Sequence, residues 1–346
     1  METLENITII VPTHMNRTSY LERMLDFYST QEFSGKIVIG DSSEEPALSN
    51  NLDLVKKYQD LNIRHIIYPK SKYTNAGKIA TDITKYIDTD YVCFSGDDDF
   101  QFPETLKICI DFLKYNPNHI GAHGCKVKYD INLYEETNQV KIENVSYVRG
   151  QQLDTEDPVF RFRAYMRSET SPQYHVMRKS VWESMNKYSF SLPDTYFLVS
   201  EVLPCSLYYI SGKVKRFDNI VQYMMEQTDV SYQSMNIDYI IQGINSKGWG
   251  ECLTAIRDLI VDALVEKGVS VEIAGRAFDE EYNFRVLRLF HDQFAKKYQT
   301  TFEEFNKIYQ AHIAIHDKGQ SLSESTLKDS ISMIVPNLIS FINGKA

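Results

Sequence analysis

Short apolar runs alternate with helix-patterned segments over the first 115 residues of this chain. The run at 7–11, ITIIV, is solidly apolar, as expected of a strand that is buried on both faces of a sheet. Three further runs with strand character lie at 36–40, 63–68 and 91–95. Strands that alternate with helices predict an α/β fold, in which a mostly parallel sheet carries flanking helices on both faces.

The helices between these strands are expected from apolar residues that recur every three or four positions. Residues 21–28 follow this spacing, and Ser19 with Glu22 predicts a capping box at the start of that helix. Pro103 stands where a first-turn proline is tolerated, so it predicts the start of a helix after the fourth strand. Two further helices are expected around 52–61 and 79–87.

Beyond residue 120 the pattern changes twice. Segments 120–129 and 138–148 alternate like half-exposed strands and predict a hairpin. From about residue 236 onward the apolar stripes are helical. We therefore expect two domains, 1–232 with the sheet and 233–346 as a helical C-terminal region. The stripes of the second domain predict packing on the first domain or on a second copy of the chain, which would form a homo-oligomer.

Composition narrows the classes of partner and compartment. The 346 residues carry a formal net charge of −10, which argues against nucleic acid, because phosphate binding requires clustered Lys and Arg. The five cysteines are scattered without metal-ligand spacing, so they are expected to be reduced thiols. The apolar run near the N-terminus reads as neither a signal peptide nor a transmembrane helix. A cytoplasmic location is expected, with peripheral attachment at the inner face of the membrane as the alternative.

Three consecutive aspartates, Asp97, Asp98 and Asp99, directly follow the fourth expected strand and its Ser-Gly pair. We call them the acidic triplet. Like charges this close repel one another, and a divalent cation would relieve that repulsion. Carboxylate oxygens suit Mg²⁺ or Mn²⁺, which keep open positions for water and substrate phosphates. The alternative is that the acids favour the N-terminus of the helix at Pro103 through its dipole.

Polar residues also follow the first two expected strands. Thr13, His14 and Arg17 come after the first, and Asp41 ends the second. The carboxyl ends of parallel strands lie at one edge of a sheet, where ligands gather. These residues and the acidic triplet are therefore expected to line one crevice.

At these strand ends the sequence resembles family-2 glycosyltransferases of the GT-A fold, a Rossmann-like fold. The segments that carry the resemblance are ITIIVPTHMNRTSYLERML at 7–25, IVIGDSS at 37–43 and SGDDDFQFPETL at 95–106. A fourth segment, NAGKIATDI at 75–83, occupies the place of the family's Asn-x-Gly segment. The resemblance covers about residues 5–230 and fades within roughly the last hundred of these.

The resemblance implies a site for a nucleotide-sugar donor and a metal ion. Asp41 takes a place near the base and ribose, and Lys78 takes a place near the nucleotide. Asp97 and Asp99 stand where the family has its DxD-type motif, so Asp99, with Asp97, is the expected ligand of Mn²⁺ or Mg²⁺. The residues placed around the donor are Pro12, Thr13, His14, Arg17, Asp41, Lys78, Asp97 and Asp98.

The implied reaction is metal-dependent transfer of a sugar from a nucleotide-diphosphate donor to a hydroxyl group, with inversion. The family places a carboxylate base shortly before a helix that ends in glycine. Glu201 lies eleven residues before Gly212, and Pro204 stands at the expected start of that helix. Ser200 departs from the family pattern, which has an acid there, and Asp194 is therefore the alternative base.

The acceptor stays open, because a glycan, a lipid-linked or a protein acceptor in bacterial-type surface glycan synthesis would each fit. Two other functions also stay open. A sugar nucleotidyltransferase would require a glycine-rich loop after the first strand, and residues 11–17 contain no glycine. A degenerate transferase fold that serves as a binding or assembly module is favoured by Ser200 and opposed by the intact acidic triplet.

Overall fold

The computed structural model describes residues 4–70, 76–134, 139–150, 152–168, 171–192, 198–226 and 248–298. The chain divides into two compact units, Met1–Ser234 and Met235–Ala346. Within the described residues, the first unit contains the sheet and its helices, and the second contains two long helices.

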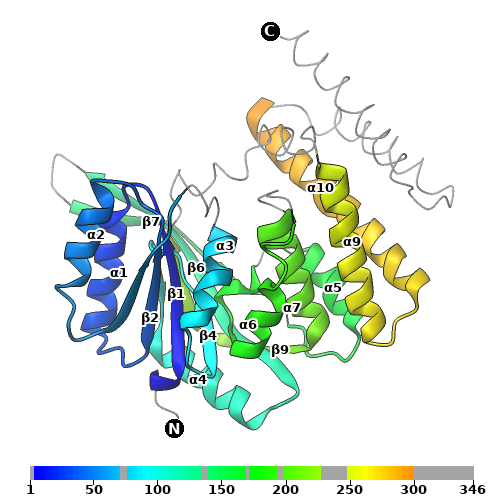
Figure 1. Cartoon of the computed structure of the whole chain (residues 1–346), viewed down its shortest axis with the longest axis horizontal. Helices are drawn as coiled ribbons and strands as arrows, with labels where there is room; N and C mark the ends of the chain where they lie inside the picture. Colours follow the sequence, from blue (N-terminus) through cyan, green and yellow to red (C-terminus); the bar gives the residue numbers. More distant parts are fainter. Residues whose placement is uncertain are drawn as a thin grey trace. The chain divides into compact units, whose positions relative to one another are not determined.

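One half of the sheet is parallel. The spatial order of its strands is β3, β2, β1 and β4 (Figure 1), and every neighbouring pair among them is parallel. The bounds are β1 Ile7–Thr13, β2 Lys36–Asp41, β3 Asn62–Ile67 and β4 Tyr91–Phe94. All four overlap the apolar runs of the sequence, so the predicted α/β fold is confirmed.

The other half of the sheet is mixed. Beyond β4 follow β8, β6, β9 and β5, while β7 pairs with β6 outside this path. The β6–β9 pair is parallel and the remaining pairs of this half are antiparallel, including the β6–β7 hairpin that the sequence predicted. The bounds are β5 Asp99–Gln101, β6 His119–Tyr134, β7 Gln139–Val148, β8 Val176–Arg178 and β9 Lys213–Glu226.

Helices cover both faces of the sheet (Figure 1). Ile7, Ile9 and Val11 of β1 form one buried cluster with side chains of α1, α2 and α4. On the opposite face α3 packs so closely on β2 that a Cβ at Gly40 would collide with Ile79. The bounds are α1 Thr18–Thr30, α2 Ala47–Val55, α3 Ala76–Asp82, α4 Pro103–Tyr115, α5 Pro158–Met166, α6 Lys179–Asn186 and α7 Leu203–Ser211.

Four short helical turns complete the first unit as described. Three are 3₁₀ turns, and the fourth is a single π-helical turn that runs directly into α7. Their bounds are η1 Leu4–Asn6, η2 Ile83–Tyr86, η3 Pro172–Tyr174 and, for the π-helical turn, η4 Leu198–Val202.

Two helix starts differ from the sequence predictions. The capping box is wrong, because α1 already begins at Thr18, which places Ser19 inside the first turn. The Thr18 hydroxyl instead donates to Asn51 Oδ1 of α2 at 2.7 Å. The helix expected at 52–61 is α2, which begins earlier, at Ala47, and ends at Val55. In contrast, α4 begins at Pro103 as predicted.

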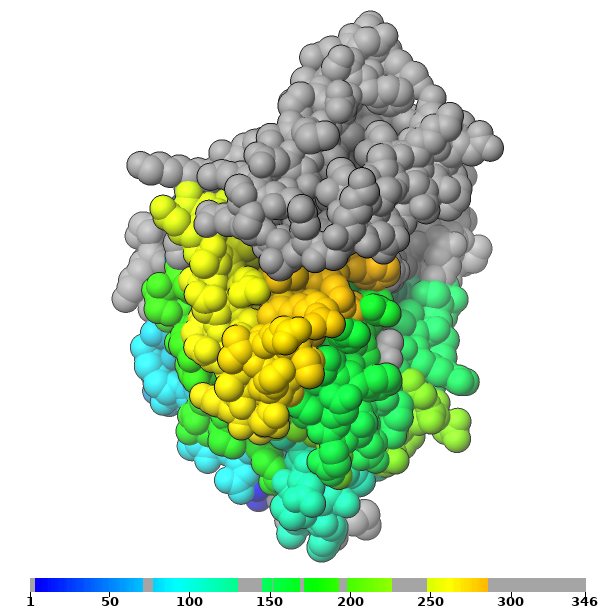
Figure 2. Space-filling view, turned by 90° about the vertical axis from the view of Figure 1, so that its right-hand side faces the viewer, coloured from blue at the N-terminus to red at the C-terminus, as the bar shows by residue number. Residues whose placement is uncertain are grey.

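The second unit contains α9 (Trp249–Glu266) and α10 (Val271–Tyr298), which pack side by side and appear as adjoining yellow and orange surfaces in Figure 2. The predicted stripe of α9 is buried, including Ile256 and Ile260. Arg257 of α9 donates two hydrogen bonds to Asp279 of α10, at 2.8 and 3.0 Å. In the described part of the chain, no helix combines the length and apolar character needed to span a membrane.

Candidate functional site

Asp97 and Asp98 of the acidic triplet lie in the turn that joins β4 to β5, and Asp99 is the first residue of β5. The Ser95 N–H donates to the Ile10 carbonyl of β1 at 2.9 Å, which holds this turn beside the parallel strands. The turn is tight at Gly96, where a Cβ would lie 2.6 Å from Asp99 Oδ2 and 2.7 Å from Asp98 Oδ1. Any side chain at position 96 would displace these two carboxylates, so the arrangement requires glycine.

Arg17 binds the first two aspartates of the triplet. Its Nε donates to Asp97 Oδ1 at 2.8 Å, and its Nη2 lies 2.8 Å from the same oxygen and 2.6 Å from Asp98 Oδ2. The Thr13 hydroxyl donates to Asp97 Oδ2 at 2.6 Å. All these side chains are buried, and burial raises the pKa of Asp97 although the ion pair with Arg17 opposes the shift. One internal cation therefore offsets part of the repulsion within the triplet.

Asp99 has different partners from the other two aspartates. Its Oδ2 accepts hydrogen bonds from the Tyr174 hydroxyl at 2.6 Å and from the Gly96 N–H at 3.2 Å. Its Oδ1 is buried and has no hydrogen-bond partner among the described residues. Burial, together with the charge of Asp98, raises the pKa of Asp99 to about 8. A buried carboxylate oxygen in this position is costly unless a proton or a cation compensates it.

The triplet fits a divalent cation at one oxygen. Thr13 and Arg17 engage both oxygens of Asp97, which leaves Asp99 Oδ1 as the buried oxygen that a cation fits. Across the described ranges, no group of three or more His, Cys, Asp or Glu side chains is arranged to hold a metal ion. A cation at Asp99 would therefore take water and substrate oxygens as its further ligands, as is usual for Mg²⁺.

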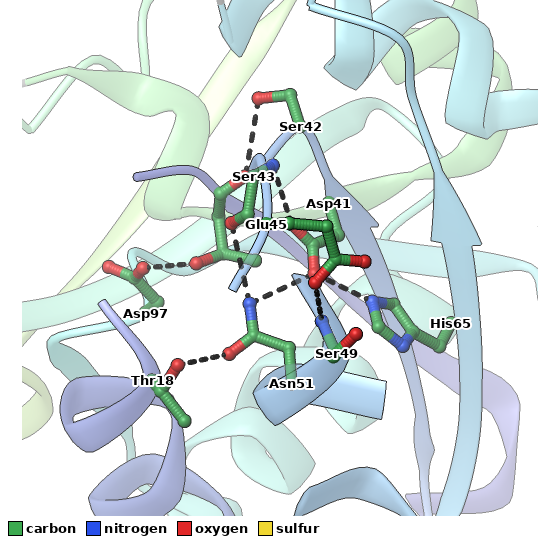
Figure 3. Close-up of polar contacts among 10 residues, drawn as sticks. Thr18, Asp41, Ser42, Ser43, Glu45, Ser49, Asn51, His65 and Asp97 are labelled. Atoms are coloured by element: carbon green, nitrogen blue, oxygen red, sulfur yellow. Dashed lines mark hydrogen bonds and ion pairs between the residues drawn. The ribbon is translucent and has the colours of Figure 1, made fainter. Parts of the chain in front are cut away.

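Asp41 ends β2 inside a closed hydrogen-bond network (Figure 3). Its carboxylate accepts from the Ser43 N–H at 2.8 Å and from Asn51 Nδ2 at 2.9 Å, and it lies 3.0 Å from His65 Nε2. The side chain is fully buried. Burial alone would raise its pKa, but the hydrogen bonds from these three partners lower the pKa of Asp41 below its usual value. Because Asn51 also accepts from Thr18, the network joins β2, β3, α1 and α2.

Thr13 connects this network to the acidic triplet. It lies opposite Asp41 in the β1–β2 register, and its carbonyl accepts from the Ser42 N–H at 2.9 Å. Its hydroxyl donates to Asp97, so one residue contacts both strand ends. Pro12 lies within β1, and the exposed His14 follows the strand. The structure therefore brings the three predicted strand ends together. It also buries the Asp41 carboxylate, which was expected near the base and ribose of the nucleotide.

Lys78 and Glu201 belong to elements that pack against each other, α3 and η4. Both side chains are half-buried. The Tyr165 hydroxyl of α5 donates to the Glu201 carbonyl at 3.3 Å, which ties the π-helical turn to α5. Asp194, the alternative base, lies outside the described residues.

The helix that follows Glu201 has the expected proline and glycine. Pro204 lies in the first turn of α7, and Gly212 follows its last residue. Gly212 has an extended backbone, with φ −178°, and does not form a left-handed cap. A Cβ there would lie 2.5 Å from Ile120 Cγ2 of β6, so any other residue at this position would displace the Ile120 side chain.

One short element, η3, connects the Glu201 turn to the triplet. Gln173 Nε2 donates to the Ser200 carbonyl at 3.1 Å, and the next residue, Tyr174, donates to Asp99. Two successive side chains of η3 therefore hold the segment with the candidate base and the candidate metal ligand. Neither Gln173 nor Tyr174 was predicted as a site residue, since neither belongs to a motif and each partner is far away along the chain.

Comparison with known proteins shows the fold. No protein-family model and no curated protein matches the chain. Residues 1–349 of S. aureus TarS in complex with UDP-GlcNAc align over 86% of this chain and 77% of that one, with a TM-score of 0.53 and 14% identity. The UDP complex of the same fragment gives a TM-score of 0.51 and 15% identity, over 86% of this chain and 76% of that one.

A longer structure of S. aureus TarS aligns with a TM-score of 0.45 and 15% identity over 76% of this chain. The alignment spans only 43% of that longer protein. At these identities the likeness to TarS 1–349 establishes a shared α/β fold, in which a curled sheet carries flanking helices.

Proposed function

We propose that this chain is an inverting glycosyltransferase that moves a sugar from a nucleotide-diphosphate donor to a hydroxyl acceptor. The observation that carries the proposal is Asp99 Oδ1, a buried carboxylate oxygen without a hydrogen-bond partner in the described part of the chain. It lies beside the ends of parallel strands, where α/β proteins bind ligands. The fold shared with TarS 1–349, which was solved with UDP and with UDP-GlcNAc, supports a nucleotide-sugar donor.

Asp99 is the residue that would hold a Mn²⁺ or Mg²⁺ ion. When bound, such an ion would neutralise the negative charge that develops on the departing diphosphate. Arg17 keeps the Asp97 carboxylate in a fixed orientation beside this position. Lys78, on α3, is proposed to add positive charge near the donor phosphates.

Glu201 is the proposed base, which would take the proton from the acceptor hydroxyl. Two contacts of η3 support this assignment. Gln173 binds the carbonyl of Ser200, which precedes Glu201, and Tyr174, the next residue of η3, binds Asp99. Asp194 stays the alternative base. A glycan, a lipid-linked or a protein acceptor would each supply a suitable hydroxyl.

Hydrolysis of a panel of UDP-sugars and GDP-sugars by the purified chain tests the proposal. We expect Mn²⁺-dependent release of nucleotide from one class of donor, and loss of that activity when EDTA removes the metal. Hydrolysis that is equally fast without metal would contradict the role of Asp99. Release of pyrophosphate from a nucleoside triphosphate and a sugar phosphate would instead indicate a nucleotidyltransferase.

The binding-module alternative rests on one specific observation. Arg17 is bound to two of the three aspartates, so most of the triplet already has a cation within the protein. Tight binding of a nucleotide sugar without any turnover, with or without Mn²⁺, would support that alternative.

A further inference from the structure

The hydrogen bond from Tyr174 to Asp99 is the shortest contact of this carboxylate. The hydroxyl donates to Oδ2 at 2.6 Å, whereas the Gly96 N–H donates to the same oxygen at 3.2 Å. Hydrogen bonds to an ionised carboxylate at such a distance are about twice as strong as neutral ones. The hydrogen bond from Tyr174 therefore occupies Oδ2 and leaves Oδ1 available to another ligand.

The Tyr174 side chain is itself held from several sides. Its ring stacks on Tyr223 of β9, with centroids 4.5 Å apart and planes at 10°. Phe94 of β4 contacts it edge-on at 5.4 Å. The Tyr174 carbonyl accepts from Gln222 Nε2 at 2.5 Å and from Gln101 Nε2 at 3.4 Å. Both ends of the residue are thus fixed to β4, β5 and β9, so the hydroxyl has little freedom to follow a moving carboxylate.

The fixed position of the Tyr174 hydroxyl also fixes the orientation of the Asp99 carboxylate. With Oδ2 bound to Tyr174 and Gly96, the carboxylate cannot rotate about its last bond without breaking two hydrogen bonds. Its Oδ1 is then kept in one buried position. Without the hydroxyl, only the longer bond to the Gly96 N–H would oppose rotation, and the ligand oxygen would have no fixed place.

We propose that Tyr174 is a positioning residue for the metal site: its hydroxyl binds Asp99 Oδ2 and thereby presents Oδ1 to a divalent cation. This inference rests on the proposed function, because it takes Asp99 as the residue that holds the cation. Partners of this kind, which hold a metal ligand without touching the metal, typically change metal affinity by 10- to 100-fold when they are removed.

The test is a titration of the full chain with Mn²⁺ in the presence of UDP and, separately, of GDP. Electron paramagnetic resonance measures the free ion and the spectrum of the bound ion. Tyr174→Phe keeps the stacked ring and removes the hydroxyl. Tyr208→Phe is the matched control, since it removes a buried hydroxyl that lies 3.1 Å from His175 Nδ1 instead. Thermal unfolding of each variant verifies that the fold persists.

We expect Tyr174→Phe to bind Mn²⁺ about 10- to 100-fold more weakly than the parent and to alter the spectrum of the bound ion. The Tyr208→Phe variant should match the parent in both measurements. Equal affinity and an unchanged spectrum in Tyr174→Phe, with binding lost in Asp99→Asn, would overturn the role of Tyr174 and leave the proposed metal site intact. Full binding in Asp99→Asn, or none in the parent with either nucleotide, would overturn the metal site and the inference together.

Discussion

At the scale of single residues, three adjacent aspartates are tolerated because each has a different environment. Arg17 binds Asp97 and Asp98, whereas Tyr174 and the Gly96 N–H bind Asp99, and burial together with the charge of Asp98 raises the pKa of Asp99 to about 8. The sequence predicted which residues meet at the strand ends, because motif and strand position coincide there. It did not predict the Arg17 ion pairs, since a long side chain can reach many partners and the turn geometry selects among them.

The base assignment is testable at the same scale. Glu201→Gln keeps the shape of the side chain and removes its basicity, so we expect the transfer rate to fall by about 10²- to 10⁴-fold. Binding of the nucleotide sugar, measured by calorimetry, should persist because the proposed donor contacts lie elsewhere. Asp194→Asn should reduce the rate less. A larger loss in Asp194→Asn than in Glu201→Gln would identify Asp194 as the base.

At the scale of elements, short apolar runs predicted the four parallel strands, and alternating apolar residues predicted the β6–β7 hairpin. It did not predict η3, a turn of three residues whose position depends on contacts with Ser200 and Asp99 far along the chain. The same limit applies to Asn51 and His65, which belong to no motif and bind Asp41 only after α2 and β3 have packed beside β2.

The stack of two histidines between β6 and β8 predicts a pH dependence of stability. The rings of His123 and His175 lie 3.9 Å apart and nearly parallel, and burial followed by the charge of His123 lowers the pKa of His175 well below 6.5. The unfolded chain therefore binds a proton near pH 6.5 that the folded chain does not, and the contribution of His175 is lost as the pH falls below that value.

His175→Gln removes this titration and retains a hydrogen-bonding group for the Tyr208 hydroxyl. We expect the variant to be less stable than the parent at about pH 7.5, and the gap to shrink by about 1.4 kcal/mol at about pH 5.5. Urea unfolding at the two pH values measures the free energy of unfolding for both proteins. A gap that is independent of pH would show that His175 has the same pKa in the folded and the unfolded chain.

At the scale of the whole molecule, the candidate site belongs to one unit. Every described residue around the triplet, the Asp41 network and the Glu201 turn lies within Met1–Ser234, which contains its own buried core. The second unit has a core of its own between α9 and α10. It also exposes apolar side chains near the turn that joins these helices, namely Val265, Val271 and Ile273. These favour the sequence-based proposal of self-association through the C-terminal helices.

Separating the two units tests this division of roles. Because a compact unit with its own core can fold alone, we expect the fragment 1–234 to bind nucleotide and Mn²⁺ with the affinity of the full chain. Self-association, measured by sedimentation, should occur in the full chain and disappear in the fragment, since the exposed apolar residues of α9 and α10 are then absent. Folded fragment that has lost nucleotide binding would show that the second unit contributes to the site. A fragment that still self-associates would locate the interface in the sheet unit instead.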